Sequence, residues 1–338
     1  MSAVMQIYAA PMEGITGFIY RETLAEQFGG YDKYFSPFAA ATHTRSFKHR
    51  ELEDMDPAHN RNQVLVPQIL ASQSGDFIWA ARFMADLGYR EVNLNLGCPV
   101  GTVVRKHKGA GMLQDPGLLD CFLEAVFDGC RDSGPGISLK TRIGLEDTKQ
   151  ADRLFEIYAR YPLAELIIHP RTREQYYKGL PDLDRFGELL QVYEDRGGRA
   201  PVCYNGNIYN EEDMAEIRRR FPSVRSVMTG RGMLRNPALA RQLKGGQILT
   251  KAELRRFHDS LYAAYQQVMP GGGPLVNRMK ELWTHMAILF PDGGRQVKSI
   301  YKARSPVEYE GAVRVLFNTC PMVLPERGGL DPLGYNVT

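Results

Sequence analysis

The sequence predicts an α/β fold, a (β/α)8 TIM barrel followed by a small all-helical domain near the C-terminal end. Eight short runs rich in Val, Ile, Leu and Tyr recur between helix-like segments from residue 6 to residue 230. They show little alternation of polar and apolar residues, which is typical of parallel strands buried on both faces. Beyond residue 245 the strand-like runs stop and helical patterns take over.

The predicted strands are short, and helix signals lie between them. The strands are QIYAA at 6–10, KYFSPF at 33–38, LVPQIL at 65–70, EVNLNL at 91–96, GISLKT at 136–141, ELIIHP at 165–170, PVCYN at 201–205 and SVMTG at 226–230. A helix over 76–87 ends at Gly88, Asn210 is suited to cap a later helix, and Asn236 with Pro237 resembles a helix start. The alternative is a doubly wound sheet, which a count of five or six strands would favour.

Three parts of the chain are expected. Residues 1–245 form the barrel and 246–326 a helical domain, in which we expect helices over about 250–268, 276–289, 294–304 and 306–318. Residues 327–338 are rich in Gly and Pro and are expected to be a loosely held tail.

Composition narrows the class of protein. Among the 338 residues, 43% are hydrophobic and 24% charged, which is typical of a globular protein with a sizeable core. No apolar run approaches the ~20 residues that span a bilayer, and the first residues lack a signal pattern, so we expect a cytoplasmic protein. The five cysteines form no CxxC pair, which argues against a disulfide framework and a metal site. The net charge of +3 is modest, but the segment 218–256 is basic and could face an anionic partner or only solvent.

Polar residues follow the predicted strands. In barrels the carboxyl ends of the strands carry the active site. These residues are Pro11 and Met12, Gln68, Asn95 and Cys98, Lys140 and Arg142, His169 and Arg171, Asn205, Gly206 and Asn207, and finally Gly230 and Arg231. Each alone could be structural, but burying all of them together is costly unless a polar ligand satisfies them. The glycines after the last two strands, followed by a helix start, indicate that this ligand carries a phosphate.

The same residues carry a resemblance to a known family. The segments APMEG (10–14), PQI (67–69), NLNLGCP (93–99), VVRKHKGAGMLQDP (103–116), LKTRIG (139–144), HPRTREQYYKG (169–179), NGNI (205–208) and TGRGMLRNP (229–237) occur in this order. Together they resemble the tRNA-dihydrouridine synthases, which are FMN-dependent barrels with a C-terminal helical domain. The resemblance covers the whole barrel, whereas the helical domain matches only loosely.

The resemblance implies an activity and a role for each residue. Uridine in tRNA would be reduced at C5–C6 with FMN as cofactor and NADPH as electron donor, Cys98 giving the proton to C5. Pro11, Met12, Gln68, Lys140 and His169 would contact the flavin ring or ribityl chain, and Asn205, Gly206, Asn207, Gly230 and Arg231 its phosphate end. Asn95, Arg142, Arg171 and Tyr177 would bind the substrate. The RNA backbone would be held by basic residues of the helical domain and by the run 218–220, which lets the uridine flip out of the RNA into the barrel. The helical-domain residues are Arg278, Lys280, Lys298, Lys302 and Arg304. We expect the protein to act as a monomer.

Several points stay open in the sequence. Asn207 stands where the family more often has an acid. The segment 42–56 follows no recognisable pattern, and its basic-then-acidic order is compatible with a substrate-contacting loop or with a solvated helix. Ribosomal RNA is an alternative substrate, and NADH an alternative donor. A dihydroorotate-dehydrogenase-like enzyme acting on a free pyrimidine, or an RNA-binding protein without catalysis, are the alternative functions.

Overall fold

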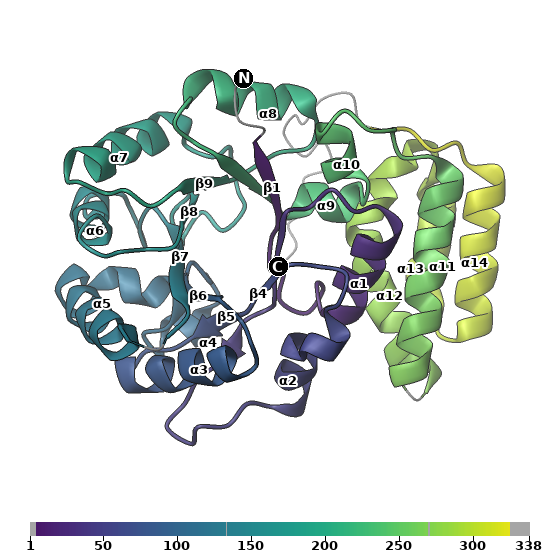
Figure 1. Ribbon diagram of the computed structural model, residues 1–338. Coiled ribbons are helices and arrows are strands. Elements are labelled where there is room, and N and C mark those ends of the chain that lie inside the picture. Colours follow the sequence, from purple (N-terminus) through teal and green to yellow (C-terminus); the bar gives the residue numbers. More distant parts are fainter. Residues whose placement is uncertain (1–4, 133, 270, 325–338) are drawn as a thin grey trace.

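The structure, a computed structural model, describes residues 5–132, 134–269 and 271–324; the predicted tail 327–338 lies outside this part. A curled parallel sheet lies inside a ring of helices, and a bundle of further helices packs against one side of that ring (Figure 1). The predicted barrel followed by a helical C-terminal region is therefore confirmed.

Ten strand segments form the sheet. They are β1 (Gln6–Ala9), β2 (Lys33–Phe35), β3 (Ala39–Ala40), β4 (Leu65–Val66), β5 (Gln68–Leu70), β6 (Glu91–Leu96), β7 (Gly136–Arg142), β8 (Leu166–His169), β9 (Val202–Asn205) and β10 (Ser226–Thr229). All pairings are parallel, in the order β3-β5-β6-β7-β8-β9-β10-β1-β2-β4.

Pro67 explains why one predicted strand is divided. Proline has no N–H to give to a ladder, so β4 and β5 are separate segments. The Pro67 carbonyl still accepts a hydrogen bond from Asn93 N at 2.9 Å. The segments on either side of Pro67 are thus one interrupted strand, which pairs with β2 on one side and β6 on the other and closes the barrel. The predicted strand at 33–38 is likewise interrupted, and its second half, β3, lies just beyond the predicted end.

Helices cover the outside of the barrel. They are α1 (Phe18–Gln27), α2 (His49–Met55), α3 (Ser74–Asp86), α4 (Gly101–Val104), α5 (Pro116–Cys130), α6 (Ala151–Tyr158), α7 (Leu183–Asp195), α8 (Glu211–Arg220), α9 (Arg231–Arg235) and α10 (Leu239–Leu243). Asn210 caps α8 as predicted, since its Oδ1 accepts from Asp213 N at 2.9 Å. The helix start predicted at Asn236 is shifted: α9 begins directly after Gly230, and Asn236 caps the turn before α10.

Two separate cores stabilise the barrel. The larger one lies between the strands and the surrounding helices. The smaller one fills the barrel interior with inward-facing side chains, namely Tyr8, Ala10, Phe35, Val66, Ile167, Cys203 and Met228. This packed interior makes the barrel a solid platform, with polar layers above and below it.

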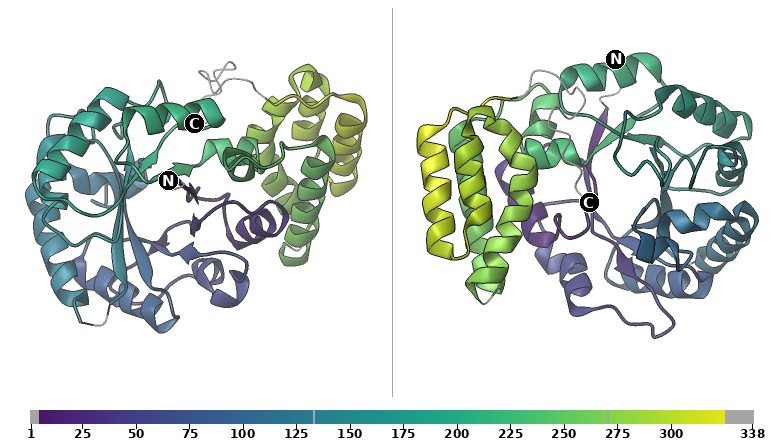
Figure 2. Two further views of the ribbon diagram at one scale, coloured as in Figure 1. Left: turned by 45° about the horizontal axis from the view of Figure 1, so that its top comes forward. Right: turned by 180° about the vertical axis from the view of Figure 1, so that it is seen from behind.

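The C-terminal helices are α11 (Lys251–Val268), α12 (Gly272–Met286), α13 (Gly294–Lys302) and α14 (Pro306–Thr319). Thr250 and Glu253 form a capping box at the start of α11. Phe257 of α11 packs edge-on against Tyr20 and Phe28 at the two ends of α1, with ring centroids 5.7 and 5.4 Å apart. Figure 2 shows these helices as one bundle beside the barrel. None of the described helices is long and apolar enough to cross a membrane.

Candidate functional site

Polar side chains from five strands, β5 to β9, meet at the carboxyl end of the barrel. The parallel register places Asn95 beside Lys140, and Arg142 beside His169. Asn205 pairs with Met228, one residue before the end of β10. Gln68, Asn95, His169 and Asn205 are all less than a tenth exposed. The polar residues predicted at separate strand ends therefore do form one site, the barrel mouth.

The Cys98 loop is held by hydrogen bonds to its backbone. Asn95 Oδ1 accepts from Gly97 N at 3.0 Å and from Cys98 N at 2.9 Å. Arg142 Nε donates to Gly97 O at 2.8 Å, and Arg173 Nε donates to Pro99 O at 3.1 Å. The carbonyls on both sides of the cysteine are thus each bound by an arginine, and the thiol sits on a fixed turn.

Gly109 closes this turn from below. Its φ is +56°, and a Cβ there would lie 2.9 Å from Cys98 Cβ, so only glycine fits. The neighbouring Ala110 N donates to Cys98 O at 3.1 Å. This explains the glycine in the segment 103–116 as a support for the cysteine.

The thiol of Cys98 is protonated at neutral pH. Burial raises its pKa, and the nearby Glu13 carboxylate adds to the rise, whereas Val100 N–H, Arg142 and Lys140 oppose it. Because burial outweighs the opposing cations, Cys98 is suited to donate a proton and does not rest as a thiolate.

A chain of amides runs inward from the Cys98 loop. Asn95 Nδ2 donates to Gln68 Oε1 at 2.7 Å, and Gln68 Nε2 donates to Asn93 Oδ1 at 2.8 Å. Asn93 Nδ2 in turn donates to Ser138 Oγ at 2.9 Å. Each amide thereby fixes the orientation of the next one. Asn93 was not predicted as a site residue, although its position two residues before Asn95 places it on the same face of β6.

At the barrel mouth, the Lys140 ammonium lacks a hydrogen-bond acceptor in the described part of the chain. Burial, together with the nearby Arg142, lowers its pKa to about 8. An ammonium that is partly withdrawn from water and has no acceptor among the described residues is well placed to donate to an acceptor on a ligand.

Asn207 joins two cations on the opposite side of the mouth. Its Oδ1 accepts from Arg231 Nη2 at 2.8 Å and from Arg171 Nη2 at 3.3 Å. Arg171 Nη1 donates to His169 Nε2 at 2.9 Å, which makes His169 a neutral ring with its proton on Nδ1. The pKa of His169 is lowered by burial and by the surrounding cations. The buried Nε of Arg171 has no partner within the described residues. Asn207, which stands where the family more often has an acid, thus still accepts a hydrogen bond from each of the two arginines through its amide oxygen.

Tyr177 covers this cationic corner. Its ring lies 5.0 Å from the Arg231 guanidinium and 5.9 Å from that of Arg142, and its side chain is 43% exposed. On the neighbouring strand end, a Cβ on Gly230 would lie 3.2 Å from Met12 Sδ, which brings the loops after β1 and β10 together. Pro11 directly precedes Met12 in the first of these loops. The mouth therefore has one aromatic wall and one thioether wall.

Several basic side chains that were predicted to contact the substrate or the RNA form hydrogen bonds or ion pairs within the protein. Both remaining hydrogen bonds of Arg142 go to backbone carbonyls, at Thr172 (2.9 Å) and Tyr176 (3.0 Å). In the helical region, Arg278 donates to Gly14 O and Lys280 to Ala303 O. Five of the eleven cations of the predicted basic surface over 218–256 form ion pairs with described residues: Arg219 with Glu216, Arg220 with Asp184, Arg241 with Glu253, Lys244 with Asp32 and Arg255 with Asp259. These ion pairs reduce the positive charge that the segment 218–256 can present to an anionic partner.

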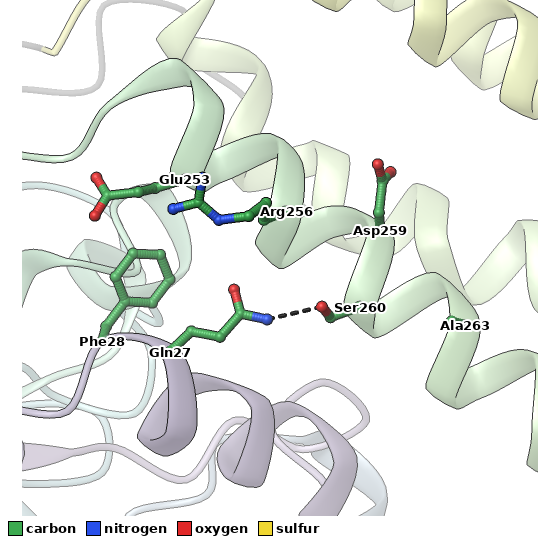
Figure 3. A pocket seen from close by; sticks show the side chains of 7 residues that line it. All are labelled: Gln27, Phe28, Glu253, Arg256, Asp259, Ser260 and Ala263. Atoms are coloured by element: carbon green, nitrogen blue, oxygen red, sulfur yellow. Dashed lines mark hydrogen bonds between the residues drawn. The ribbon is translucent and has the colours of Figure 1, made fainter.

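A second concavity lies between α1 and α11. Gln27, Glu253, Arg256 and Ser260 line it, and Gln27 Nε2 donates to Ser260 Oγ at 2.8 Å (Figure 3). Because Gln27 ends α1, this groove opens near the amino ends of the strands. It is separate from the barrel mouth.

The fold and the mouth together define a barrel enzyme with a half-buried thiol and a cationic ligand site. The profile of the family "Dihydrouridine synthase (Dus)" matches residues 8–302, and this chain belongs to that family. Family membership implies a flavin cofactor and a nicotinamide reductant, and the unpartnered Lys140 ammonium fits such an acceptor-rich group.

Relatives agree with this assignment. The chain is 30% identical over 248 residues to a tRNA-dihydrouridine(16) synthase of Pseudomonas syringae pv. tomato, covering 72% of this chain and 76% of the relative. It is 28% identical over 267 residues to a probable tRNA-dihydrouridine synthase of Staphylococcus aureus, covering 76% and 77%. Among solved structures, a morphinone reductase variant in complex with tetrahydroNAD is similar in fold alone, with a TM-score of 0.50 and 12% identity over 72% of this chain and 87% of that one.

Proposed function

We propose that this protein reduces the C5–C6 double bond of uridine in tRNA to dihydrouridine, with FMN as cofactor and NADPH as electron donor. The observation that carries the proposal is the Cys98 thiol, held protonated on a fixed turn at the mouth of a barrel whose Lys140 ammonium has no partner among the described residues. The family match and the names of the relatives support the substrate.

The residues for the cofactor divide into two groups. Met12, Gln68, Lys140 and His169 would hold the ring and ribityl chain, with Lys140 and the Nδ1–H of His169 as donors. Asn205, Asn207, Gly230 and Arg231 would hold the phosphate end, where two guanidiniums already converge on Asn207. The flavin, when bound and reduced, supplies the hydride for C6 of the uracil.

Cys98 would deliver the proton to C5. A thiol with a raised pKa still transfers a proton to an enolate-like carbon that is becoming more basic. The product then carries one hydride at C6 and one proton at C5. The thiolate left behind would be stabilised by Val100 N–H, Arg142 and Lys140, all of which favour the charged form.

The uracil edge would be read by donors that the fold leaves available. Asn95 Nδ2 has one hydrogen beyond its bond to Gln68, and the buried Arg171 Nε lacks a partner within the described residues. Tyr177 offers an exposed ring for stacking. Arg142 would act by holding Gly97 and not by touching the base, which revises its predicted role as a substrate contact.

A uridine inside a folded RNA must be flipped out to reach this mouth. We propose that the protein acts as a monomer on tRNA in the cytoplasm. The test is mass spectrometry of nucleosides from tRNA and ribosomal RNA fractions of cells with and without the gene. Loss of dihydrouridine from tRNA alone supports the proposal. Loss from ribosomal RNA alone changes the substrate, and no loss in either fraction, in a strain without related enzymes, favours a small-molecule flavoenzyme.

A further inference from the structure

Two basic segments lie together on the rim of the barrel mouth. The first is 42–50, which follows β3, and the second is 101–108, which follows the Cys98 turn after β6. The order β3-β5-β6 brings these loops to neighbouring positions on the rim. Lys108 Nζ of the second segment donates to Ala41 O at the start of the first, at 3.1 Å. We call the two segments the basic rim.

Five cations of the basic rim are exposed and without an ion-pair partner among the described residues. They are Arg45, Lys48, Arg50, Arg105 and Lys106. Neither segment contains Asp or Glu. In the segment 218–256, by contrast, five of the eleven Lys and Arg side chains form ion pairs with described residues.

Four acids approach the basic rim from its surroundings, and the carboxylate of one of them, Glu53, lies 3.8 Å from His49 Nε2. Glu51 is used by the backbone, since its carboxylate accepts from Lys48 N at 2.9 Å and from Ala40 N at 3.3 Å. Glu13 interacts with Arg50 and Lys48, and Asp76 with Lys108. These acids are too few to neutralise the basic side chains, so the rim keeps a positive potential.

The first segment is anchored firmly. Phe47 packs on α3, with its ring centroid 4.9 Å from Trp79 and 5.6 Å from Phe83. The hydroxyls of Thr42 and Thr44 are 2.7 Å apart, and the Thr44 hydroxyl is 3.2 Å from Ser46 Oγ. The cations are therefore displayed by a structured loop, which reduces the entropy lost when they bind a ligand.

Backbone conformation singles out the same loops. In the described part of the chain, the non-glycine residues with positive φ are Arg45 (50°), His107 (50°) and Tyr176 (49°). All three lie in loops at the carboxyl ends of strands, and two belong to the basic rim. Such conformations are uncommon outside glycine and cluster where a loop has a binding role.

We propose that the basic rim binds the phosphate backbone of the RNA whose uridine enters the mouth. The rim adjoins the Cys98 turn through Gly109, so strand phosphates next to a flipped uridine would pass over it. The proposal rests on the proposed function. It gives a role to the segment 42–50, and it provides phosphate contacts on a part of the mouth separated from the C-terminal helices by α1 and α2 (Figure 1).

The test compares rim variants with a matched control on the other face of the barrel. One variant is Arg45→Gln/Lys48→Gln/Arg50→Gln and a second, independent one is Arg105→Gln/Lys106→Gln. The control is Arg90→Gln/Arg199→Gln/Arg225→Gln, three exposed arginines just before β6, β9 and β10. The flavin-loaded enzymes are assayed on an unmodified tRNA transcript, and reduction of the flavin by NADPH serves as a readout that the rim should not change.

Phosphate binding has a defined signature. We expect KM for tRNA to rise about tenfold in the triple rim variant at moderate salt, with kcat changed less than about twofold. The slope of log affinity against log salt should decrease by about 0.7 to 0.9 for each phosphate that the variant no longer binds. The control should match the wild type in both.

Two failures are distinguishable. If the wild type forms no dihydrouridine on any tRNA, the proposed function fails. If the wild type is active and both rim variants keep its KM and salt slope, the proposed function stands and the rim proposal is overturned. Equal changes in the rim variants and the control would also overturn it, because the effect would then come from net charge alone.

Discussion

The two ends of the barrel treat a lysine in opposite ways. At the amino end, Lys33 Nζ donates to Glu91 Oε2 at 2.7 Å and to Glu165 Oε2 at 3.0 Å. Burial opposes its charge, but the two carboxylates outweigh burial and raise its pKa. At the carboxyl end, Lys140 has no such partner among the described residues, and burial lowers its pKa to about 8.

This difference separates stability from function within one scaffold. Glu165 also accepts from Ser226 Oγ at 2.9 Å, so the amino end satisfies most of its own polar groups. The carboxyl end leaves Lys140 and Arg171 Nε unsatisfied within the described residues, which is destabilising until a ligand binds. At the amino end Glu91 Oε1 is also buried without a partner among the described residues, so the two ends differ in whether the lysine is paired and not in every polar group.

The largest effect is expected from the two thiols. Cys98→Ala should lower dihydrouridine formation by about 10³-fold, since general acid catalysis contributes about 10² to 10⁴. The variant should still bind flavin and oxidise NADPH, because the cysteine backbone and not its thiol carries the loop hydrogen bonds. Nucleoside mass spectrometry and stopped-flow absorbance measure the two steps. Cys203 lies fully buried in the interior core, so Cys203→Ala should lose stability and keep the chemistry. A Cys98→Ala enzyme with wild-type yield would contradict the assignment.

The next largest effect is expected at the amino end of the barrel, called the floor here, where Lys33 lies between Glu91 and Glu165. Lys33→Met removes the cation between two carboxylates, and breaking such a partly buried pair should cost about 3 kcal/mol of unfolding free energy. Urea unfolding followed by circular dichroism measures the loss. The folded fraction should keep its flavin, because the mouth is separated from the floor by the interior core. A stable variant that loses flavin would break the division between the two ends.

Lys140→Met should have the opposite profile. Removing a partly buried, unpartnered ammonium should leave the flavin-free protein as stable as the wild type or more so. Loss of a charged donor should weaken flavin binding by about ten- to hundredfold, corresponding to about 1.5–3 kcal/mol for a hydrogen bond to a charged group. Fluorescence titration of free flavin measures this. Unchanged affinity would remove Lys140 from the cofactor site.

The barrel was predictable because buried parallel strands are continuous apolar runs with polar residues after them. That the candidate residues would gather at one place was predictable for the same reason, since carboxyl ends of parallel strands meet at one end of the barrel. The sequence shows that Pro67 interrupts a strand. The hydrogen bond from Asn93 N of β6 to the Pro67 carbonyl could not be predicted, because it depends on the register of the two strands in the fold.

Side-chain partners were less predictable than positions. Arg142 was expected at the substrate, and its guanidinium instead binds three backbone carbonyls. Arg173 supports the Cys98 turn from a distant loop, an interaction that no local spacing encodes. From the count of charged residues, the segment 218–256 and not 42–50 was predicted as the basic surface. Ion pairs between different helices, such as Arg220 with Asp184, cannot be inferred from the linear sequence.

The finest comparison of the two lysines is their dependence on pH. Because the pKa of Lys140 is lowered to about 8, the folded protein without flavin loses this proton at a pH where the unfolded chain, near 10.5, keeps it. The unfolding free energy should therefore rise with pH between about 8 and 10.5. A bound flavin that accepts from Lys140 restores the charge, so binding takes up a proton in this window. Flavin affinity should be constant below about pH 8 and fall by up to about tenfold per pH unit above it.

Lys140→Arg provides the control, since a guanidinium stays charged throughout this range and should give a flat profile. Lys33, whose pKa is raised, stays charged in the same window and should contribute no slope there. Titrations of flavin from about pH 6.5 to about pH 10 would decide the point. A wild-type affinity independent of pH would mean that the Lys140 ammonium gains its partner from elsewhere, and the contrast between the two ends of the barrel would then lie in geometry and not in charge.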